Sequence, residues 1–372
     1  MTPDLDVCVR GGGIVGHTLA LSLARERLRV GLVTSSASTP AFQGTDARAY
    51  ALNAKSRSLL QSLRCWPDPG QATEVLTMQV KGDQGGEVNF CAVDLDVPGL
   101  MWIVDVPTLE SNLAAAIGFQ TRIEVLDRPR AAALTVVCEG KSSSTRSEFG
   151  VAFDVKPYHQ SAVAARVQCA KAHAQCAYQW FSNGEILALL PLDGPQANSM
   201  AIVWSVPRQR ADELLGVDAA EFCRLLEGVS GAPLGAMNLI SERSAWPLQS
   251  AHASRWSGRH AGLPWVLVGD AAHNVHPLAG QGLNLGLADV AVLSATLGAR
   301  EYWRQIGDER LLRRYERARK LQVLAMDRTV DGLQQLFASH APGWQAARNW
   351  GMKGFDRSGL IKQWIARQAM GS

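Results

Sequence analysis

The sequence predicts an α/β fold, and three observations support this prediction. Asp6 to Arg10 has the pattern of a buried strand and leads directly into Gly11-Gly12-Gly13-Ile14-Val15-Gly16. A helical pattern and a second strand, Val30 to Val33, follow this turn. Trp265 to Val268 is another short apolar run, and it ends at Gly269-Asp270. With 47% apolar residues among 372, the chain can bury one large domain or two closely joined ones.

The N-terminal turn has the Gly-x-Gly-x-x-Gly spacing of a dinucleotide-binding βαβ unit. Gly11 permits the tight turn, Gly13 lets a pyrophosphate approach the backbone, and Gly16 lets the helix pack closely. Ile14 and Val15 lie at the start of the helix, where backbone N–H groups have no partner within the helix. These five residues are therefore predicted to bind the cofactor.

A second turn follows the strand that ends at Val268. Gly269-Asp270 places a carboxylate at the carboxyl end of that strand, where ligands bind in open α/β sheets. A loop with Pro277, Gly280 and Gly282 leads into an apolar pattern that predicts a helix from Leu283 to about Leu297. An ordinary strand–loop–helix corner is the alternative, but three glycines beside a carboxylate indicate close approach to a ligand.

The second turn also carries a family resemblance. Gly-Asp-Ala-Ala-His, His-Pro and Gly-Gln-Gly-Leu-Asn-Leu-Gly-Leu-Ala-Asp, within residues 269–289, resemble the second flavin fingerprint of the class A FAD-dependent aromatic hydroxylases. These enzymes share the fold of p-hydroxybenzoate hydroxylase, and the ubiquinone-biosynthesis branch is the most similar. The resemblance extends from about residue 4 to residue 371. It implies a Rossmann-like FAD-binding domain interleaved with a β-sheet substrate domain, followed by a helical C-terminal region.

The resemblance implies roles for residues of the second turn. It places cofactor contacts at Gly269, Asp270, Gly280, Gly282, Leu283 and Asn284. In the family the Asp binds the ribityl hydroxyls and the loop amides face flavin N1 and O2. Arg48 takes the position of an arginine that lies along the flavin and the pyrophosphate. His276 and Pro277 belong to the turn that lines the active site on the substrate side, which makes them the candidate catalytic residues.

The resemblance also divides the chain. Residues 1–74, 107–155 and 257–298 are expected to form the FAD-binding domain, 75–106 and 156–256 the substrate domain, and 299–372 the helical C-terminal region. Within the substrate domain, residues 211–228 are predicted to form one helix. Only about twenty residues separate the predicted helix Leu109 to Ile117 from the central motif Cys138-Glu139-Gly140. Most of the β-meander that the family has there is therefore expected to be missing.

Five positions depart from the family pattern. Thr34 stands where an acidic residue binds the adenosine ribose, and Val106 stands at a polar, FAD-contacting position. Arg10 replaces an aliphatic residue, Arg27 a turn glycine, and Glu139 the aspartate of the central motif. Each departure predicts a weaker hold on FAD, and Arg10 needs a partner or access to solvent.

The resemblance implies an FAD-dependent monooxygenase that hydroxylates an aromatic ring. NAD(P)H would reduce the flavin, and O2 would supply the oxygen atom. The branch implies a prenylated phenol or quinone precursor of ubiquinone biosynthesis as the substrate. Two alternatives stay open, namely another flavin oxidoreductase on the same fold and an accessory or scaffold protein with impaired FAD binding. The sequence also leaves open whether NADH or NADPH is the reductant and which ring position is hydroxylated. The oligomeric state is open too, and a homo-oligomer is one possibility.

Composition limits the other classes of function. Seven cysteines without Cys-x-x-Cys spacing, and no signal peptide, predict a cytoplasmic protein without structural zinc. His273 and His276 have no further ligand cluster in their loop, so no metal is expected. No run of 18 uncharged apolar residues predicts a transmembrane helix. The sequence gives no reason to expect a nucleic-acid partner.

The C-terminal region is basic, with 14 Lys and Arg against 7 Asp and Glu in residues 300–372. Gly359 to Met370 places Leu360, Ile361, Trp364 and Ile365 on one helical face. This pattern fits a peripheral contact with the inner membrane face or with a protein of the ubiquinone pathway. It fits equally a face that packs onto the protein's own core or onto a second subunit.

Overall fold

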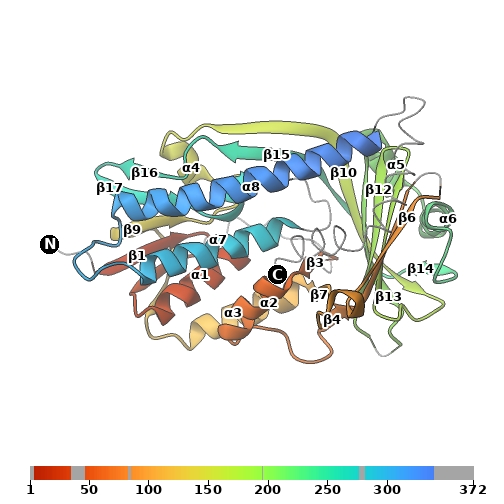
Figure 1. Ribbon diagram of the computed structural model, residues 1–372, viewed down its shortest axis with the longest axis horizontal. Coiled ribbons are helices and arrows are strands. Elements are labelled where there is room, and N and C mark those ends of the chain that lie inside the picture. The colour runs from red at the N-terminus through yellow and green to blue at the C-terminus, as the bar shows by residue number, and fades with distance from the viewer. Residues whose placement is uncertain (1–3, 35–46, 83–84, 195, 276–280, 339–372) are drawn as a thin grey trace.

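The structure, a computed structural model, describes residues 4–34, 47–82, 85–194, 196–275 and 281–338. Its strands form three sheets, which Figure 1 shows from the six-stranded sheet at the left to the nine-stranded sheet at the right. The α/β class predicted from the sequence is confirmed.

A six-stranded sheet with the order β16-β17-β9-β1-β2-β8 forms the first layer. Its strands are β1 (Leu5–Arg10), β2 (Val30–Val33), β8 (Ile123–Leu126), β9 (Ala132–Val137), β16 (Ser257–His260) and β17 (Leu263–Leu267). Apart from the β16–β17 hairpin, neighbouring strands are parallel. Residues of α1 (Ile14–Arg25), α3 (Val106–Gly118) and α7 (Gln281–Gly298) lie in the same apolar core as this sheet, together with Leu60, Leu312, Tyr315 and Val323 from other helices. Helix α1 is the crossover connection between the neighbouring parallel strands β1 and β2.

The segment between α3 and the central motif is short, as the sequence predicts. Residues 119–131 contain one strand, β8, and β8 pairs in parallel with β2 at the edge of the six-stranded sheet. The segment therefore extends the sheet, and no separate meander forms within it. A small cluster covers the sheet there, made of Leu5, Cys8, Val33, Leu126 and Ala132.

The second layer is a nine-stranded sheet with the order β18-β15-β10-β13-β12-β11-β5-β6, with β14 beside β10. Its strands are β5 (Thr77–Lys81), β6 (Glu87–Cys91), β10 (Phe153–Cys169), β11 (Cys176–Ser182), β12 (Glu185–Leu192), β13 (Ser199–Pro207), β14 (Met237–Leu239), β15 (Ser244–Ala253) and β18 (His273–Asn274). The long strands β10 and β15 reach from this sheet toward the six-stranded sheet (Figure 1).

Two helices cover the outer face of the nine-stranded sheet, α5 (Arg208–Gly216) and α6 (Ala219–Ser230), and they share an apolar cluster with it. The prediction of one helix over residues 211–228 was wrong. Val217 is extended, with ψ of 159°, and the Asp218 side chain then accepts a hydrogen bond from the Glu221 amide. This cap begins a new helix and so separates α5 from α6.

A three-stranded sheet joins the two larger ones. It consists of β3 (Ala49–Leu52), β4 (Ala72–Val75) and β7 (Met101–Asp105), with α2 (Ala54–Ser62) after β3 and the short helix η1 (Val93–Leu95) between β6 and β7. Arg166 on β10 binds Asp105 on β7 at 2.9 Å, so the inner face of the nine-stranded sheet faces the small sheet. The domain boundaries drawn from the sequence stay a prediction.

The helix α8 (Glu309–Ala338) follows α7 and runs along the molecule from the six-stranded sheet toward the nine-stranded one (Figure 1). It lies within the region 299–372 that is predicted to be helical, and residues 299–308 before it form turns and irregular structure. In the part of the chain that the structure describes, no helix is long and apolar enough to cross a bilayer. The predicted amphipathic segment Gly359 to Met370 lies outside the described residues.

Candidate dinucleotide-binding site

The turn after β1 depends on close backbone contacts. Gly11 has φ of 121°, and a Cβ there would lie 2.4 Å from the carbonyl oxygen of Cys138. A Cβ on Gly16 would lie 1.9 Å from the carbonyl oxygen of Gly11. Gly13 differs, because among the described residues only Gly13 itself and its chain neighbours lie within 4 Å of where its Cβ would be. Gly11 and Gly16 therefore serve the turn itself, whereas Gly13 borders open space.

The helix α1 begins at this open space. Gly13 is its N-cap, and no side chain caps the first turn. The N–H groups of a first helical turn have no partner within the helix, and the helix dipole makes them attractive to an anion. A pyrophosphate beside Gly13 fits this arrangement of space, donors and dipole.

The second turn is the short helix η2 (Gly269–Ala271), which follows β17. Gly269 has φ of 64°, in the left-handed region that favours glycine. The half-buried Asp270 follows it. Burial raises the pKa of the Asp270 carboxyl, and the charges of His273 and Lys141 offset only part of that rise. Hydroxyl groups of a ligand that donate hydrogen bonds to such a desolvated carboxylate would stabilise its charged form.

Val15 joins the two turns. Its side chain lies against Gly269, where a Cβ would be 3.3 Å from Val15 Cγ1, and against Gly286 on α7, where a Cβ would be 2.8 Å from Val15 Cγ2. The first turn of α1, the second turn and α7 therefore interlock around one apolar side chain. The two turns that the sequence predicts for one ligand are brought together.

A buried ionic cluster centred on Asp289 supports the second turn. Asp289 on α7 is fully buried and accepts three hydrogen bonds, from the Gly269 amide at 2.8 Å, His273 Nε2 at 2.6 Å and Arg319 Nε at 2.6 Å. Burial by itself would raise the pKa of Asp289, but His273 and Arg319 more than offset it, so the pKa lies below its usual value. The His273 ring also stacks on Trp256, with centroids 4.9 Å apart. His273 is therefore part of the support for the turn.

The helix α8 supplies the cation of this cluster and fixes the strand before the turn. Arg319 also donates to the carbonyl oxygen of Leu285 at 3.1 Å. One turn earlier, the Tyr315 hydroxyl donates to the carbonyl oxygen of Leu267 at 3.1 Å. The Glu316 carboxylate accepts from the Trp256 amide at 3.1 Å. These contacts between α8 and the second turn were not predicted from the sequence. The single charge at Asp289 in an otherwise uncharged α7 nevertheless indicates a buried partner.

The central motif lies beside the first turn, between β9 and α4 (Ser144–Glu148). The Glu139 carboxylate accepts from the Ser143 hydroxyl at 2.7 Å, the Thr145 amide at 3.0 Å and the Thr145 hydroxyl at 2.6 Å. Its charge therefore stabilises the start of α4. The buried Arg146 donates to the carbonyl oxygens of Ala271 at 3.1 Å and of Lys141 at 2.8 Å, which ties the motif to the second turn.

Asn284 joins α7 to the small sheet. Its side chain accepts from the Asn53 amide at 3.0 Å and the Ser56 hydroxyl at 2.7 Å, and it donates to the carbonyl oxygen of Ala51 at 2.8 Å. The side chain is thus engaged within the protein, which leaves the backbone for any cofactor contact at this position. Arg48 lies half-buried just before β3, where its carbonyl oxygen accepts from the Val106 amide at 3.3 Å.

The structure shows where four departures from the family pattern lie. Arg10 finds partners, because its NH1 donates to the Thr145 hydroxyl at 3.1 Å and to Glu148 at 3.3 Å. Arg27 occupies the left-handed turn after α1, with φ of 64°, at a position where glycine is easier to accommodate. Val106 is buried, and Thr34 lies beside Gly12, where a Cβ would be 2.8 Å from Thr34 Cγ2.

The predicted site residues fall into two groups. The structure places one group on the two turns, the start of α7 and the segment before β3: Gly11, Gly13, Ile14, Val15, Gly16, Arg48, Gly269, Asp270, Gly282, Leu283 and Asn284. His276, Pro277 and Gly280 lie outside the described residues. The role of each residue toward a cofactor or substrate stays a prediction.

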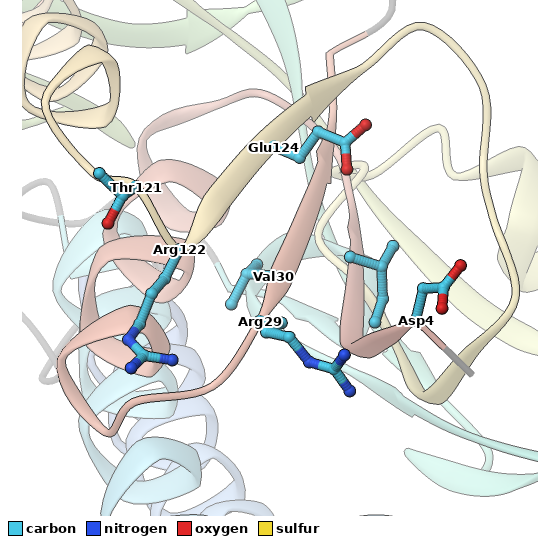
Figure 2. Close-up of a pocket in the computed structure, with 7 residues that line it drawn as sticks. Asp4, Arg29, Val30, Thr121, Arg122 and Glu124 are labelled. Carbon is cyan, nitrogen blue, oxygen red and sulfur yellow. The ribbon is translucent and has the colours of Figure 1, made fainter. Parts of the chain in front are cut away.

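A cavity of about 420 Å³ lies elsewhere, beside Leu5 and Val30 at the amino ends of β1 and β2 (Figure 2). Arg29 there pairs with Asp6 at 3.3 Å, and Arg122 donates to a backbone carbonyl oxygen. Ligands of open α/β sheets bind at the carboxyl ends of the strands. This cavity is therefore separate from the candidate site.

Comparison with known proteins identifies the family to which the chain is similar. The sequence model of the FAD binding domain family matches residues 127–329, more than half of the 372 residues. Ubiquinone hydroxylase UbiL of Rhodospirillum rubrum is 29% identical over 99% of this chain and 90% of its own. The 3-demethoxyubiquinol 3-hydroxylase of Escherichia coli is 28% identical over 98% of both chains.

Solved structures show the same fold. The p-nitrophenol 4-monooxygenase PnpA of Pseudomonas putida superposes with a TM-score of 0.75 at 17% identity, over 99% of this chain and 98% of its own. HpxO of Klebsiella pneumoniae, solved with FAD, gives 0.72 at 14% identity over 98% of both chains. The chain therefore belongs to the FAD-binding family of class A aromatic hydroxylases and is an FAD-dependent monooxygenase.

Proposed function

We propose that this protein hydroxylates the aromatic ring of a prenylated phenol or quinol precursor in ubiquinone biosynthesis, with NAD(P)H as reductant and O2 as the oxygen source. The observation that supports it most strongly is similarity along nearly the whole chain to two proteins named for hydroxylation in the ubiquinone pathway. The first glycine turn is closed by the contacts of Gly11 and Gly16, and Gly13 borders open space.

In this proposal the chain's own residues bind and orient the cofactor. The pyrophosphate lies at Gly13 and the first turn of α1, and Asp270 accepts hydrogen bonds from the ribityl hydroxyls. The backbone amides of Gly282, Leu283 and Asn284 face the electron-rich edge of the flavin ring. Bound FAD supplies electron transfer and oxygen activation, whereas the protein positions the ring and keeps water away.

The inner face of the nine-stranded sheet offers a surface for a planar ring. One row across five strands consists of Gln179, Ala188, Val203, Ala164 and Ser244. The centre of this row has small apolar side chains, and its two ends are polar. The Ser244 hydroxyl is buried and has no hydrogen-bond partner among the described residues. We place the substrate ring against this row, with Gln179 and Ser244 available to its oxygen substituents.

Two measurements test the proposal. The purified protein is titrated with FAD while flavin fluorescence is followed, and a phenol with a short prenyl chain is then supplied with NAD(P)H and isotopically labelled O2. We expect saturable binding and one labelled oxygen atom in the product. Saturable FAD binding without label in the product would favour another flavin oxidoreductase. No saturable binding at high micromolar FAD would favour the accessory or scaffold protein.

We also propose that the C-terminal segment brings the protein to an anionic membrane surface, where a prenylated substrate resides. The apolar stripe and the cations Lys362 and Arg367 support this, since each cation near such a surface contributes about 1 kcal/mol. Co-sedimentation with anionic vesicles compares the full chain with a chain truncated after Trp350. The full chain should partition more strongly, and equal partitioning would exclude this segment as the anchor.

A further inference from the structure

Arg10 occupies an unusual place, at the end of β1 and directly before the first glycine of the turn. Its NH1 donates to the Thr145 hydroxyl at 3.1 Å and lies 3.3 Å from Glu148 Oε2. Its Nε is buried and has no partner within the described part of the chain. The NH1 contacts to α4 therefore fix where this side chain lies.

The Thr145 hydroxyl connects Arg10 to Glu139. A guanidinium only donates hydrogen bonds, so the hydroxyl accepts from Arg10. The single hydroxyl proton is then free to reach Glu139 Oε1, 2.6 Å away. The result is a directed chain from Arg10 through Thr145 to Glu139, with a cation at one end and an anion at the other. Hydrogen bonds between such ends polarise one another.

The two ends of this chain belong to turns that touch. The Cys138 amide donates to the carbonyl oxygen of Arg10 at 2.7 Å. A Cβ on Gly11 would lie 2.4 Å from the Cys138 carbonyl oxygen and 2.9 Å from the Glu139 amide nitrogen. With so little space between the backbones, a shift of the Glu139 turn moves Gly11, and with it the start of α1.

We propose that Arg10, Thr145 and Glu139 form one positioning unit that holds the first glycine turn in its FAD-binding geometry. Arg10 acts through Thr145, and Thr145 acts by fixing the Glu139 carboxylate. The extra methylene of Glu139 lets one carboxylate reach both Ser143 and Thr145. The proposal concerns FAD binding, and it stands whatever substrate the enzyme hydroxylates.

A double-mutant cycle tests the unit, with the dissociation constant for FAD as its readout. Thr145→Val removes the hydroxyl at nearly constant shape, whereas Thr145→Ser retains it. Arg10→Val and Thr145→Val should each weaken FAD binding about tenfold, the size of one charge-assisted hydrogen bond. Arg10→Val in the Thr145→Val background should add less than twofold, because Arg10 then has no route to Glu139.

Conservative and control variants separate positioning from general loss of stability. Thr145→Ser should bind FAD within twofold of the unchanged protein. Arg29→Ala removes an exposed ion pair with Asp6 at the opposite end of the same sheet and should leave FAD affinity unchanged. Thermal unfolding of each apo-protein confirms that the variants fold. Additive effects of Arg10→Val and Thr145→Val, or a Thr145→Ser variant as weak as Thr145→Val, would overturn the proposal.

Discussion

Asp289→Asn is the most informative single change, because it preserves shape and removes the charge at the centre of the buried cluster. The carboxylate accepts from the Gly269 amide, His273 and Arg319 at 2.6–2.8 Å. An asparagine leaves Arg319 as an unpaired charge that is 2% exposed. Breaking a buried pair in this way costs about 3–5 kcal/mol. At about 2.1 cal/mol/K per residue, a chain of 372 residues should then unfold about 4–6 °C lower.

The same change should weaken FAD binding, because the Gly269 amide loses its charged acceptor and the Asp270 turn loses its support. One such hydrogen bond corresponds to about tenfold or more in affinity. Thermal unfolding of the apo-protein and FAD titration measure the two effects separately. Glu213→Gln is the control, because it removes only an exposed pair with Arg210. Unchanged unfolding and unchanged FAD affinity in Asp289→Asn would refute the reasoning.

The pH dependence gives a second check on this cluster. The folded-state pKa of Asp289 lies below its unfolded value, so its contribution to stability is present above the unfolded pKa and is lost as the pH falls through the folded pKa. The difference in stability between the unchanged protein and Asp289→Asn should therefore be full near neutral pH. It should shrink below about pH 3.9, the pKa of an unperturbed Asp.

The glycine turn and the second carboxylate yield two further predictions. Gly13→Ala should change apo-protein stability by no more than about 1 kcal/mol, the difference in chain entropy, yet weaken FAD binding tenfold or more. Gly11→Ala should instead destabilise the apo-protein itself by about 2–5 kcal/mol. Equal behaviour of the two variants in FAD titration and thermal unfolding would contradict these roles. The raised pKa of Asp270 means that the folded apo-protein loses stability as pH rises through that pKa. Asp270→Asn should therefore make apo-protein stability less dependent on pH while lowering FAD occupancy, and a variant with unchanged occupancy would show that Asp270 does not hold the cofactor.

Two of the departures from the family pattern, Arg10 and Glu139, have a physical explanation in the fold. With the meander reduced to β8, the sheet face around Cys8 is covered by a small cluster, and Arg10 at the edge of that face reaches α4. The Glu139 carboxylate accepts hydrogen bonds from the hydroxyls of Ser143, the N-cap of α4, and of Thr145 in its first turn. Arg10 and Glu139 are thus connected through Thr145, although in the sequence they are two separate departures from the family pattern.

The sequence alone predicted the local elements, and its resemblance to the flavin fingerprint predicted the cofactor. Strand and helix periods, and glycines whose spacing allows backbone to meet a ligand, are properties of neighbouring residues, so the turns at Gly11 and Gly269 could be predicted. The reduced meander could be predicted too, because chain length limits what can form. The break between α5 and α6 was missed because a cap at Asp218 overrode the helical pattern.

Only the tertiary structure decided which polar groups meet. Asp289 and Arg319 are separated by 30 residues, Arg10 and Thr145 by 135, and Asn53 and Asn284 by 231. No local period encodes such pairs, because they form where helices and strands from distant parts of the chain pack together. Burial then turns each into a strong constraint, since a charge or amide removed from water must find its partner there. The sequence therefore predicted the two glycine turns, and the fold revealed what holds them in place.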